Sequence, residues 1–188
     1  MPDSKDLLTT TSFHTEVSTV TVLETAKKMI DYSHGNLHDI NHFMKVYAYA
    51  KMIADGEQLD PDTQKLVEMT ALVHDIACPL CRVKYGNTNG KNQEKESAAL
   101  IAEFFKDSNL PQDFTDRISF LVSHHHTLDQ IDGIDYQIII EADYLVNADE
   151  SHFSGHNIKN MYDKIFKTET GKFLLRSMYQ NCLENETL

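Results

Sequence analysis

The sequence predicts an all-α fold. Apolar residues recur at helical spacing in most segments after about residue 20, and no two segments show the paired apolar and polar alternation of neighbouring strands. The run Ile138-Ile139-Ile140 resembles a buried strand by itself, but it continues into a helical pattern that reaches Val146. A chain of 188 residues can bury most of its apolar surface around one core, so we also expect a single domain.

The first part of the chain is expected to hold three helices and then a long loop. Residues 1–17 lack periodicity and are expected to form a loosely ordered lead-in to a domain over residues 18–188. The third helix has the clearest start, because Asp60 can cap free N–H groups and Pro61 suits a first helical turn. Residues 78–90 are rich in Gly and Asn and contain a proline, which predicts a loop. The three helices are expected over residues 20–32, 39–56 and 61–76.

The remaining helices are separated by turn signals. Asn109-Leu110-Pro111 marks one turn, and Asp132-Gly133 breaks the chain again. The helices are expected over about residues 94–106, 111–126, 138–146, 157–166 and 170–183.

Composition and charge exclude several classes of protein. The sequence has no run of the roughly 20 apolar residues that a membrane helix needs, and no readable secretory signal, so we expect a cytoplasmic protein without membrane association. Its three cysteines are an odd number, which favours reduced thiols over a disulfide framework. A net charge of -12 argues against long nucleic acid as a partner. It does not exclude a small phosphorylated substrate, because a bound divalent cation reverses the local field.

Four polar residues on three of the expected helices carry the functional prediction: His42, the adjacent pair His74 and Asp75, and Asp143. Each shares a helical stripe with apolar residues, as His42 does with Val46, so each is expected to point inward. A buried carboxylate costs several kcal/mol unless it is paired or coordinated, so these groups need a compensating cation. Mixed imidazole and carboxylate ligands predict a divalent ion, Mn, Fe, Co, Ni or Zn before Mg.

Three segments around these residues resemble known motifs. HDINHFMKVYAYAKMIA, LVEMTALVHDIA and EADYLVNAD are similar to successive motifs of the HD superfamily of metal-dependent phosphohydrolases, and the resemblance spans residues 37–146. KYGNTNGKNQE, SHHHT and DKIFKTETGKFLL resemble a subgroup of small predicted HD hydrolases. The resemblance implies an HD-domain bundle of about seven to eight helices with C-terminal helices over residues 155–185, and it allows a homo-oligomer. It also implies that His42, His74, Asp75 and Asp143 are the ligands of the first metal.

Some HD proteins bind a second metal. The resemblance implies Glu94, His124 and His125 as its candidate ligands, although Glu94 stands where two-metal members often have histidine. The consecutive histidines 124–126 cannot all face one site, and His124 and His125 follow apolar residues at helical spacing better than His126 does. Alternatively, these histidines are exposed at a helix C-terminus and interact with its dipole.

Cations and buttressing groups are also predicted near the metal. Lys84 and Lys91 lie in or beside the glycine-containing segment after His74 and Asp75, where they are candidates to neutralise a substrate phosphate, with Arg82 as a weaker candidate. His38 and Asp39 are candidates to support His42, because ligating histidines normally need a partner. Cys78 and Cys81 form an isolated CxxC, which is interpreted as free thiols rather than a zinc or redox site.

The leading hypothesis is hydrolysis of a phosphoester or phosphoanhydride in a small molecule by metal-activated water. Asp75 would orient the water, while His125, Lys84 and Lys91 would neutralise charge or protonate the leaving oxygen. By resemblance, the substrate is a nucleotide. Two alternatives stay open: a di-iron HD-type oxygenase, and a non-catalytic HD domain that binds a nucleotide or a partner.

Overall fold

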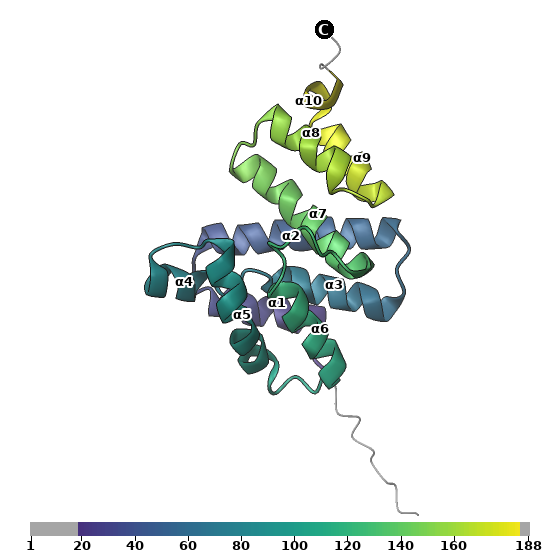
Figure 1. The fold of residues 1–188 in the computed structure, drawn as a ribbon. Coiled ribbons are helices and arrows are strands. Elements are labelled where there is room, and N and C mark those ends of the chain that lie inside the picture. Colours follow the sequence, from purple (N-terminus) through teal and green to yellow (C-terminus); the bar gives the residue numbers. More distant parts are fainter. Residues whose placement is uncertain (1–18, 185–188) are drawn as a thin grey trace, which may run out of the picture.

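A computed structural model of the chain describes residues 19–184 (Figure 1). The described residues form helices joined by short connections, with no β-strand among them, which confirms the all-α prediction. The expected lead-in over residues 1–17 lies outside this range. The helices are α1 (Val22–Tyr32), α2 (Leu37–Gly56), α3 (Pro61–Val73), α4 (Cys78–Tyr85), α5 (Gly90–Phe105), α6 (Gln112–Val122), α7 (Gly133–Glu150), α8 (Gly155–Lys164), α9 (Glu169–Met178) and α10 (Gln180–Glu184).

Helices α2, α3 and α7 form the centre of the molecule, where each packs against the other two. Figure 1 shows α2 and α3 lying side by side, with α7 crossing them and α8 to α10 gathered at one end. Two apolar clusters meet along these central helices. One is shared mainly with α8 and α9, and the other with α1, α5 and α6. On α2, His42 is followed directly by Phe43 of the second cluster and one turn later by Val46 of the first, so it is placed where the two clusters meet.

The structure differs from the expected element pattern after α3. Residues 78–85 form the helix α4 instead of a loop, because Pro79 falls in the first turn, where a missing N–H breaks no helical hydrogen bond. Gly86 then ends α4 with a positive φ of 69°, a conformation that glycine adopts without steric cost. Helix α3 ends at Val73, earlier than expected, and His74 is its C-cap. The expected helix over residues 170–183 is divided into α9 and α10; among residues 19–184 the number of helices stays close to the predicted seven to eight.

A buried carboxylate on α7 fixes the connection between α8 and α9. Glu141 is fully buried, and its carboxylate accepts hydrogen bonds from the backbone N–H groups of Lys167 and Thr168 and from the side chain of Gln137. The Thr168 hydroxyl also donates to it. Gly171 lies so close that a Cβ atom there would fall 1.9 Å from Glu141 Oε2. These contacts hold the C-terminal helices against α7.

None of the helices in residues 19–184 combines the length and the apolar character needed to cross a membrane.

Candidate metal centre

Three central helices bring four ligand groups together. His42 comes from the second turn of α2, His74 and Asp75 from the end of α3, and Asp143 from the middle of α7. The Nε2 atoms of His42 and His74 lie 3.3 Å apart. Asp143 Oδ1 lies 3.3 Å from His42 Nε2 and 3.5 Å from His74 Nε2. Asp75 Oδ2 lies 3.5 Å and 3.6 Å from the same two nitrogens.

Hydrogen bonds at the opposite ring nitrogens turn the two imidazoles toward this centre. His74 Nδ1 donates to the carbonyl oxygen of Ala71 at 2.8 Å, so a neutral His74 carries its lone pair on Nε2. His42 Nδ1 lies 2.8 Å from Glu150 Oε2. The His42 ring, like the His74 ring, therefore directs its Nε2 toward the centre. Asn147 Nδ2 donates to Asp143 Oδ1 at 2.8 Å and orients that carboxylate. Such outer hydrogen bonds are typical of metal ligands, whose basicity and direction they fix.

The spacing and chemistry of these four groups fit a divalent metal ion. Ligand atoms that surround one ion tetrahedrally at about 2.1 Å lie about 3.4 Å from one another. His42 is 6% exposed and His74 is fully buried, so acceptor atoms brought this close repel one another unless a cation lies among them. Burial lowers the pKa of His42, but its hydrogen bond to Asp143 and the charge of Asp75 outweigh burial and raise it to about 9. The same negative surroundings favour a metal ion in place of that proton.

A second group of possible ligands adjoins the first through Asp75. One possible ligand atom from each of Asp75, His125 and His126 lies within 4.8 Å of the other two. His125 Nδ1 donates to the carbonyl oxygen of Val122 at 2.8 Å, which leaves the Nε2 lone pair directed at Asp75 Oδ1, 3.6 Å away. Both of these atoms are buried and have no hydrogen-bond partner. Because buried polar atoms are rarely left unsatisfied, this pair is a second place where a cation fits.

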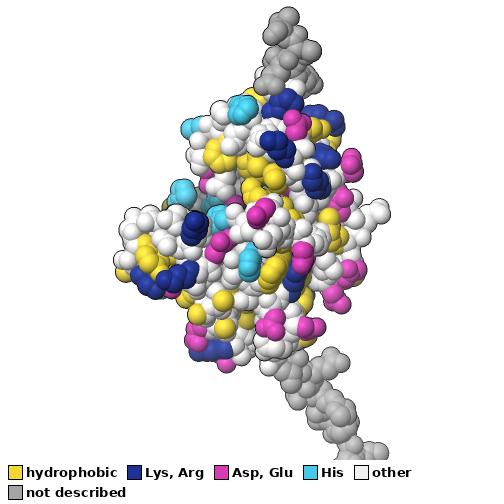
Figure 2. Space-filling view, in the orientation of Figure 1, with side chains coloured by type: hydrophobic (Ala, Val, Ile, Leu, Met, Phe, Trp, Pro, Cys, Tyr) yellow, Lys and Arg dark blue, Asp and Glu magenta, His cyan; other side chains and the backbone are white. Residues whose placement is uncertain are grey.

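A polar pocket of about 250 Å3 opens onto the first group. Arg82 lines it and pairs with Asp39 through two hydrogen bonds of 2.6 and 2.7 Å. Gln93 from α5 also lines it; its Nε2 donates to the Thr88 carbonyl, but its buried Oε1 has no partner. Figure 2 shows histidine side chains at the surface where the lobe formed by α4 and α5 meets α7. The wall of the pocket thus contains the Arg82–Asp39 ion pair and one hydrogen-bond acceptor without a partner, Gln93 Oε1.

Four of the predicted site residues are not brought to this centre. His124 stacks on Phe120 and donates through Nδ1 to the Phe120 carbonyl. Glu94 accepts a hydrogen bond from the Thr127 hydroxyl at 3.0 Å. Lys84 pairs with Glu96 at 2.8 Å, and Lys91 is exposed on α5; neither lines the polar pocket. Among the candidate cations in this segment, Arg82 is therefore the one nearest the ligand group.

The structure brings several residues to the centre that were not predicted from the sequence. His126 lines the polar pocket and joins the second ligand group, although helical spacing favoured His124 over it. The reason is that α6 ends at Val122, so residues 124–126 do not follow a helical repeat. Glu150, rather than His38 or Asp39, supports His42. His38 is 76% exposed and contacts Asp39. The position of Glu150 could have been predicted from the sequence, because Glu150 follows Asp143 by two helical turns and therefore lies on the same face of α7.

Comparisons with known proteins bear on the fold and on the family. Among solved structures, the chain resembles the crystal structure of a predicted HD superfamily hydrolase from an uncultured Thermotogales bacterium. The TM-score is 0.60 with 21% sequence identity, and the match covers 87% of this chain and 86% of that one. No curated protein gives a significant match. Residues 39–149 match the family model described as HD domain, and this range includes all four ligand groups of the first centre. The chain therefore belongs to the HD domain family.

Proposed function

We propose that the protein is a metal-dependent phosphohydrolase that cleaves a phosphoester or phosphoanhydride of a small molecule. The observation that carries this proposal is the convergence of His42, His74, Asp75 and Asp143. The two histidine Nε2 atoms lie 3.3 Å apart, and each carboxylate lies 3.3 to 3.6 Å from both of them. A centre of mixed imidazole and carboxylate groups at the base of an open pocket suits hydrolysis, because both substrate and water can reach it.

The four ligand residues would hold the first ion, and Asp75, His125 and His126 would hold a second. A bound divalent ion would lower the pKa of water and neutralise the charge of a phosphoryl group. Asp75 has a role in both groups, since Oδ2 faces His42 and His74 while Oδ1 faces His125. Glu150 and the carbonyls of Ala71 and Val122 keep the three histidines in the tautomer that binds a cation.

Other pocket residues would act on the substrate. Gln93 lines the polar pocket, and its unpaired Oε1 would accept a hydrogen bond from substrate or water. Arg82 is held rigidly by Asp39 and would contribute positive charge near a phosphate. A small phosphorylated substrate, such as a nucleotide, matches this arrangement better than long nucleic acid does, because the net charge of the chain is -12.

The test is a screen of phosphorylated compounds with Mn, Co, Ni, Mg, Zn and Fe, in which inorganic phosphate release is measured. We expect metal-dependent release by the wild-type protein and a loss of at least about a hundredfold in Asp75→Asn and Asp143→Asn. Asp149→Asn is the matched control, because Asp149 lies on the same helix but is exposed and outside both ligand groups.

Two outcomes would contradict the proposal. Equal phosphate release by wild type and Asp75→Asn would show that the ligand groups do not carry the reaction. Retention of iron with oxygen uptake and no phosphate release would instead favour the oxygenase, which needs the second group formed by Asp75, His125 and His126.

A further inference from the structure

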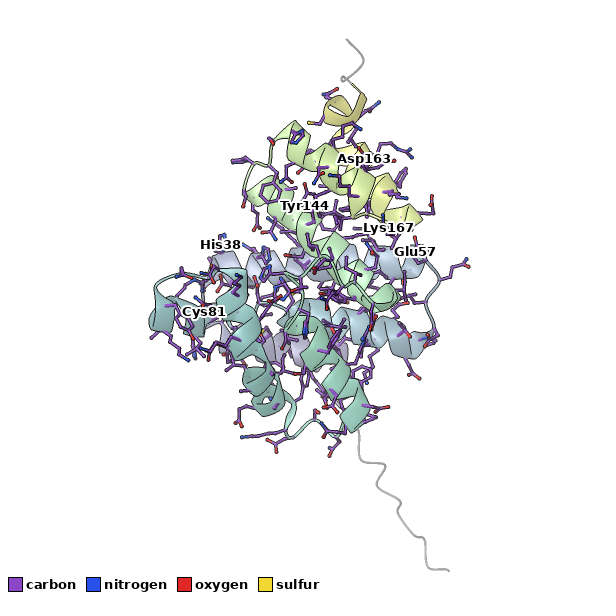
Figure 3. The ribbon with its side chains drawn as sticks, in the orientation of Figure 1. His38, Glu57, Cys81, Tyr144, Asp163 and Lys167 are labelled. Carbon is purple, nitrogen blue, oxygen red and sulfur yellow. The ribbon has the colours of Figure 1, made fainter. Side chains whose placement is uncertain are left out.

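The polar pocket lies between two parts of the fold, and one ion pair joins them. Residues of α2 and α7 line one side of the pocket. The other side, from α4, α5 and the turn between them, is lined by Cys78, Arg82, Thr88 and Gln93. Asp39 in the first turn of α2 pairs with Arg82 in the last turn of α4. Figure 3 shows the start of α2, marked by His38, beside α4, marked by Cys81.

This pair occupies the donors of Arg82 that suit an anion best. Nη1 of Arg82 donates to Asp39 Oδ2 at 2.7 Å, and Nη2 donates to Asp39 Oδ1 at 2.6 Å. A carboxylate and a phosphate match the same fork of a guanidinium, so each can take the place of the other. While Arg82 remains on Asp39, it cannot offer these two donors to a phosphate in the pocket.

The helix that carries Arg82 has little apolar packing. No residue of α4 belongs to either of the two apolar clusters of the described chain. The buried side chains of α4 are the small ones of Cys78 and Cys81, whereas Val83 is 88% exposed. Gly86 ends the helix with its positive φ of 69°. A helix with few apolar contacts opens at a lower free energy than the core does, so polar contacts have a large share in holding α4.

Two sets of polar contacts attach α4 to its neighbours. Lys84 and the Tyr85 hydroxyl both contact Glu96 Oε1, at 2.8 and 2.5 Å, and join α4 to α5 on the same side of the pocket. The contact between Arg82 and Asp39 joins α4 to α2 on the other side. Loss of this second contact would free α4 to move relative to α2 while α4 stays attached to α5.

We propose that the Asp39–Arg82 pair is a latch, which holds α4 against α2 in the free protein and opens when a phosphate replaces the Asp39 carboxylate on Arg82. The inference rests on the proposed function and deepens it, because it makes Asp39 an internal competitor of the substrate. A phosphate group carries about −1.5 to −2 at pH 7 and a carboxylate −1, so a phosphate held at the ligand groups attracts Arg82 more strongly. Arg82 would then draw α4 over the occupied pocket as a lid.

The experiment measures phosphate binding and the opening of α4. Inorganic phosphate is titrated calorimetrically into the metal-loaded protein. Hydrogen exchange of the α4 amides is followed by mass spectrometry with and without phosphate, because the N–H groups of Cys81 and Gly86 donate to carbonyl groups one turn earlier. The proteins are wild type, Asp39→Asn, Arg82→Gln and the double variant. Lys84→Gln is the matched control, since it removes the ion pair between α4 and α5 and leaves the latch intact.

We expect Asp39→Asn to bind phosphate about fivefold more tightly than wild type, because the competitor is gone. Arg82→Gln should bind it about tenfold more weakly, and adding Asp39→Asn to Arg82→Gln should change nothing further. Without phosphate, the α4 amides should exchange about fivefold faster in Asp39→Asn and Arg82→Gln. Phosphate should slow this exchange in Asp39→Asn but not in Arg82→Gln. Lys84→Gln should keep the wild-type affinity for phosphate. Both latch side chains lie at the surface, with exposed fractions of 41% for Arg82 and 12% for Asp39, so all variants should fold.

The results separate the latch from the proposed function, because inorganic phosphate binds without being hydrolysed. Tighter phosphate binding in Asp39→Asn that disappears in the double variant supports the latch even if no ester is cleaved. Equal or weaker binding in Asp39→Asn would mean that Asp39 only positions Arg82, and it overturns the latch even if esters are cleaved. Unchanged α4 exchange in Asp39→Asn, or no phosphate binding by any of the proteins, overturns it as well.

Discussion

His42 Nδ1 lies 2.8 Å from a carboxylate oxygen of Glu150, which is placed two turns after Asp143 on α7. One helix thus carries both a residue that contacts His42 Nε2 and a residue that contacts its other ring nitrogen. Glu150 is itself held by Lys45 at 3.0 Å. The orientation of His42 therefore depends on how α7 packs against α2.

Replacing Glu150 by Gln should weaken metal binding about ten- to a hundredfold, because loss of the outer carboxylate makes His42 less basic and less well oriented. Affinity is measured by competition with a chromophoric chelator. Lys45→Met is the matched control, since it removes the other partner of Glu150 and should change affinity by less. Equal affinity in wild type and Glu150→Gln would contradict this role.

Gln93→Leu should lower kcat/KM about tenfold while the unfolding midpoint stays the same or rises. Gln93 is 4% exposed, and its Oε1 is a buried acceptor without a partner beside the ligand group. Removing this unpaired oxygen offsets the loss of the hydrogen bond from Nε2 to the partly exposed Thr88. During turnover, that oxygen would accept a hydrogen bond from water or substrate. Steady-state kinetics and thermal unfolding are measured for wild type, Gln93→Leu and the control Gln130→Leu, in which the replaced side chain is exposed. Unchanged kinetics would show that Gln93 is only structural.

Two glycine substitutions should differ in their effect on stability. Gly171→Ala places a Cβ atom 1.9 Å from Glu141 Oε2, so the buried hydrogen bonds to Lys167 and Thr168 must shift. We expect a loss of about 1–3 kcal/mol in the free energy of unfolding, measured with urea. In Gly155→Ala the new Cβ meets Cys182 at 3.5 Å, an ordinary contact, and we expect no loss. Equal effects would contradict the packing described around Glu141.

Acid should destabilise the wild-type protein more than it destabilises Asp60→Asn. Hydrogen bonds from Thr63 hold the pKa of Asp60 below its usual 3.8. Because the folded pKa is the lower one, the ionised carboxylate stabilises the fold above pH 3.8, and this contribution is lost as pH falls through the folded pKa. Asn caps a helix as well as Asp but does not titrate. The free energy of unfolding is measured with urea at a series of pH values from neutral into the acid range. If it falls equally with pH in wild type and Asp60→Asn, the prediction is contradicted.

The convergence of His42, His74 and Asp143 was predictable from the sequence because the inward direction of each side chain is encoded locally. His42, His74 and Asp143 each lie on an apolar helical stripe, and helical spacing reveals which face such a stripe presents to the core. The start of α3 was equally clear, since Asp60 caps it through the N–H groups of Asp62 and Thr63.

Residues outside regular helices were less predictable. The direction of His126 depends on the turn after α6, and the role of Gln93 depends on how α5 packs beside α4. The helix α4 is hard to predict from the sequence because Pro79 is followed by a segment rich in Gly and Asn, yet a proline in the first helical turn is compatible with a helix. These features follow from tertiary contacts that spacing along one segment does not contain.

Metal retention is the most direct test of the centre formed by His42, His74, Asp75 and Asp143. Metal-free protein is loaded with Co, Mn, Zn or Fe and desalted, and bound metal is measured by mass spectrometry in wild type, His74→Ala and Asp143→Ala. His124→Ala is the control, because His124 stacks on Phe120 away from both ligand groups. We predict stoichiometric metal in wild type and the control and its loss in the other two variants; absence of bound metal in wild type, or equal retention in all four proteins, would contradict the account.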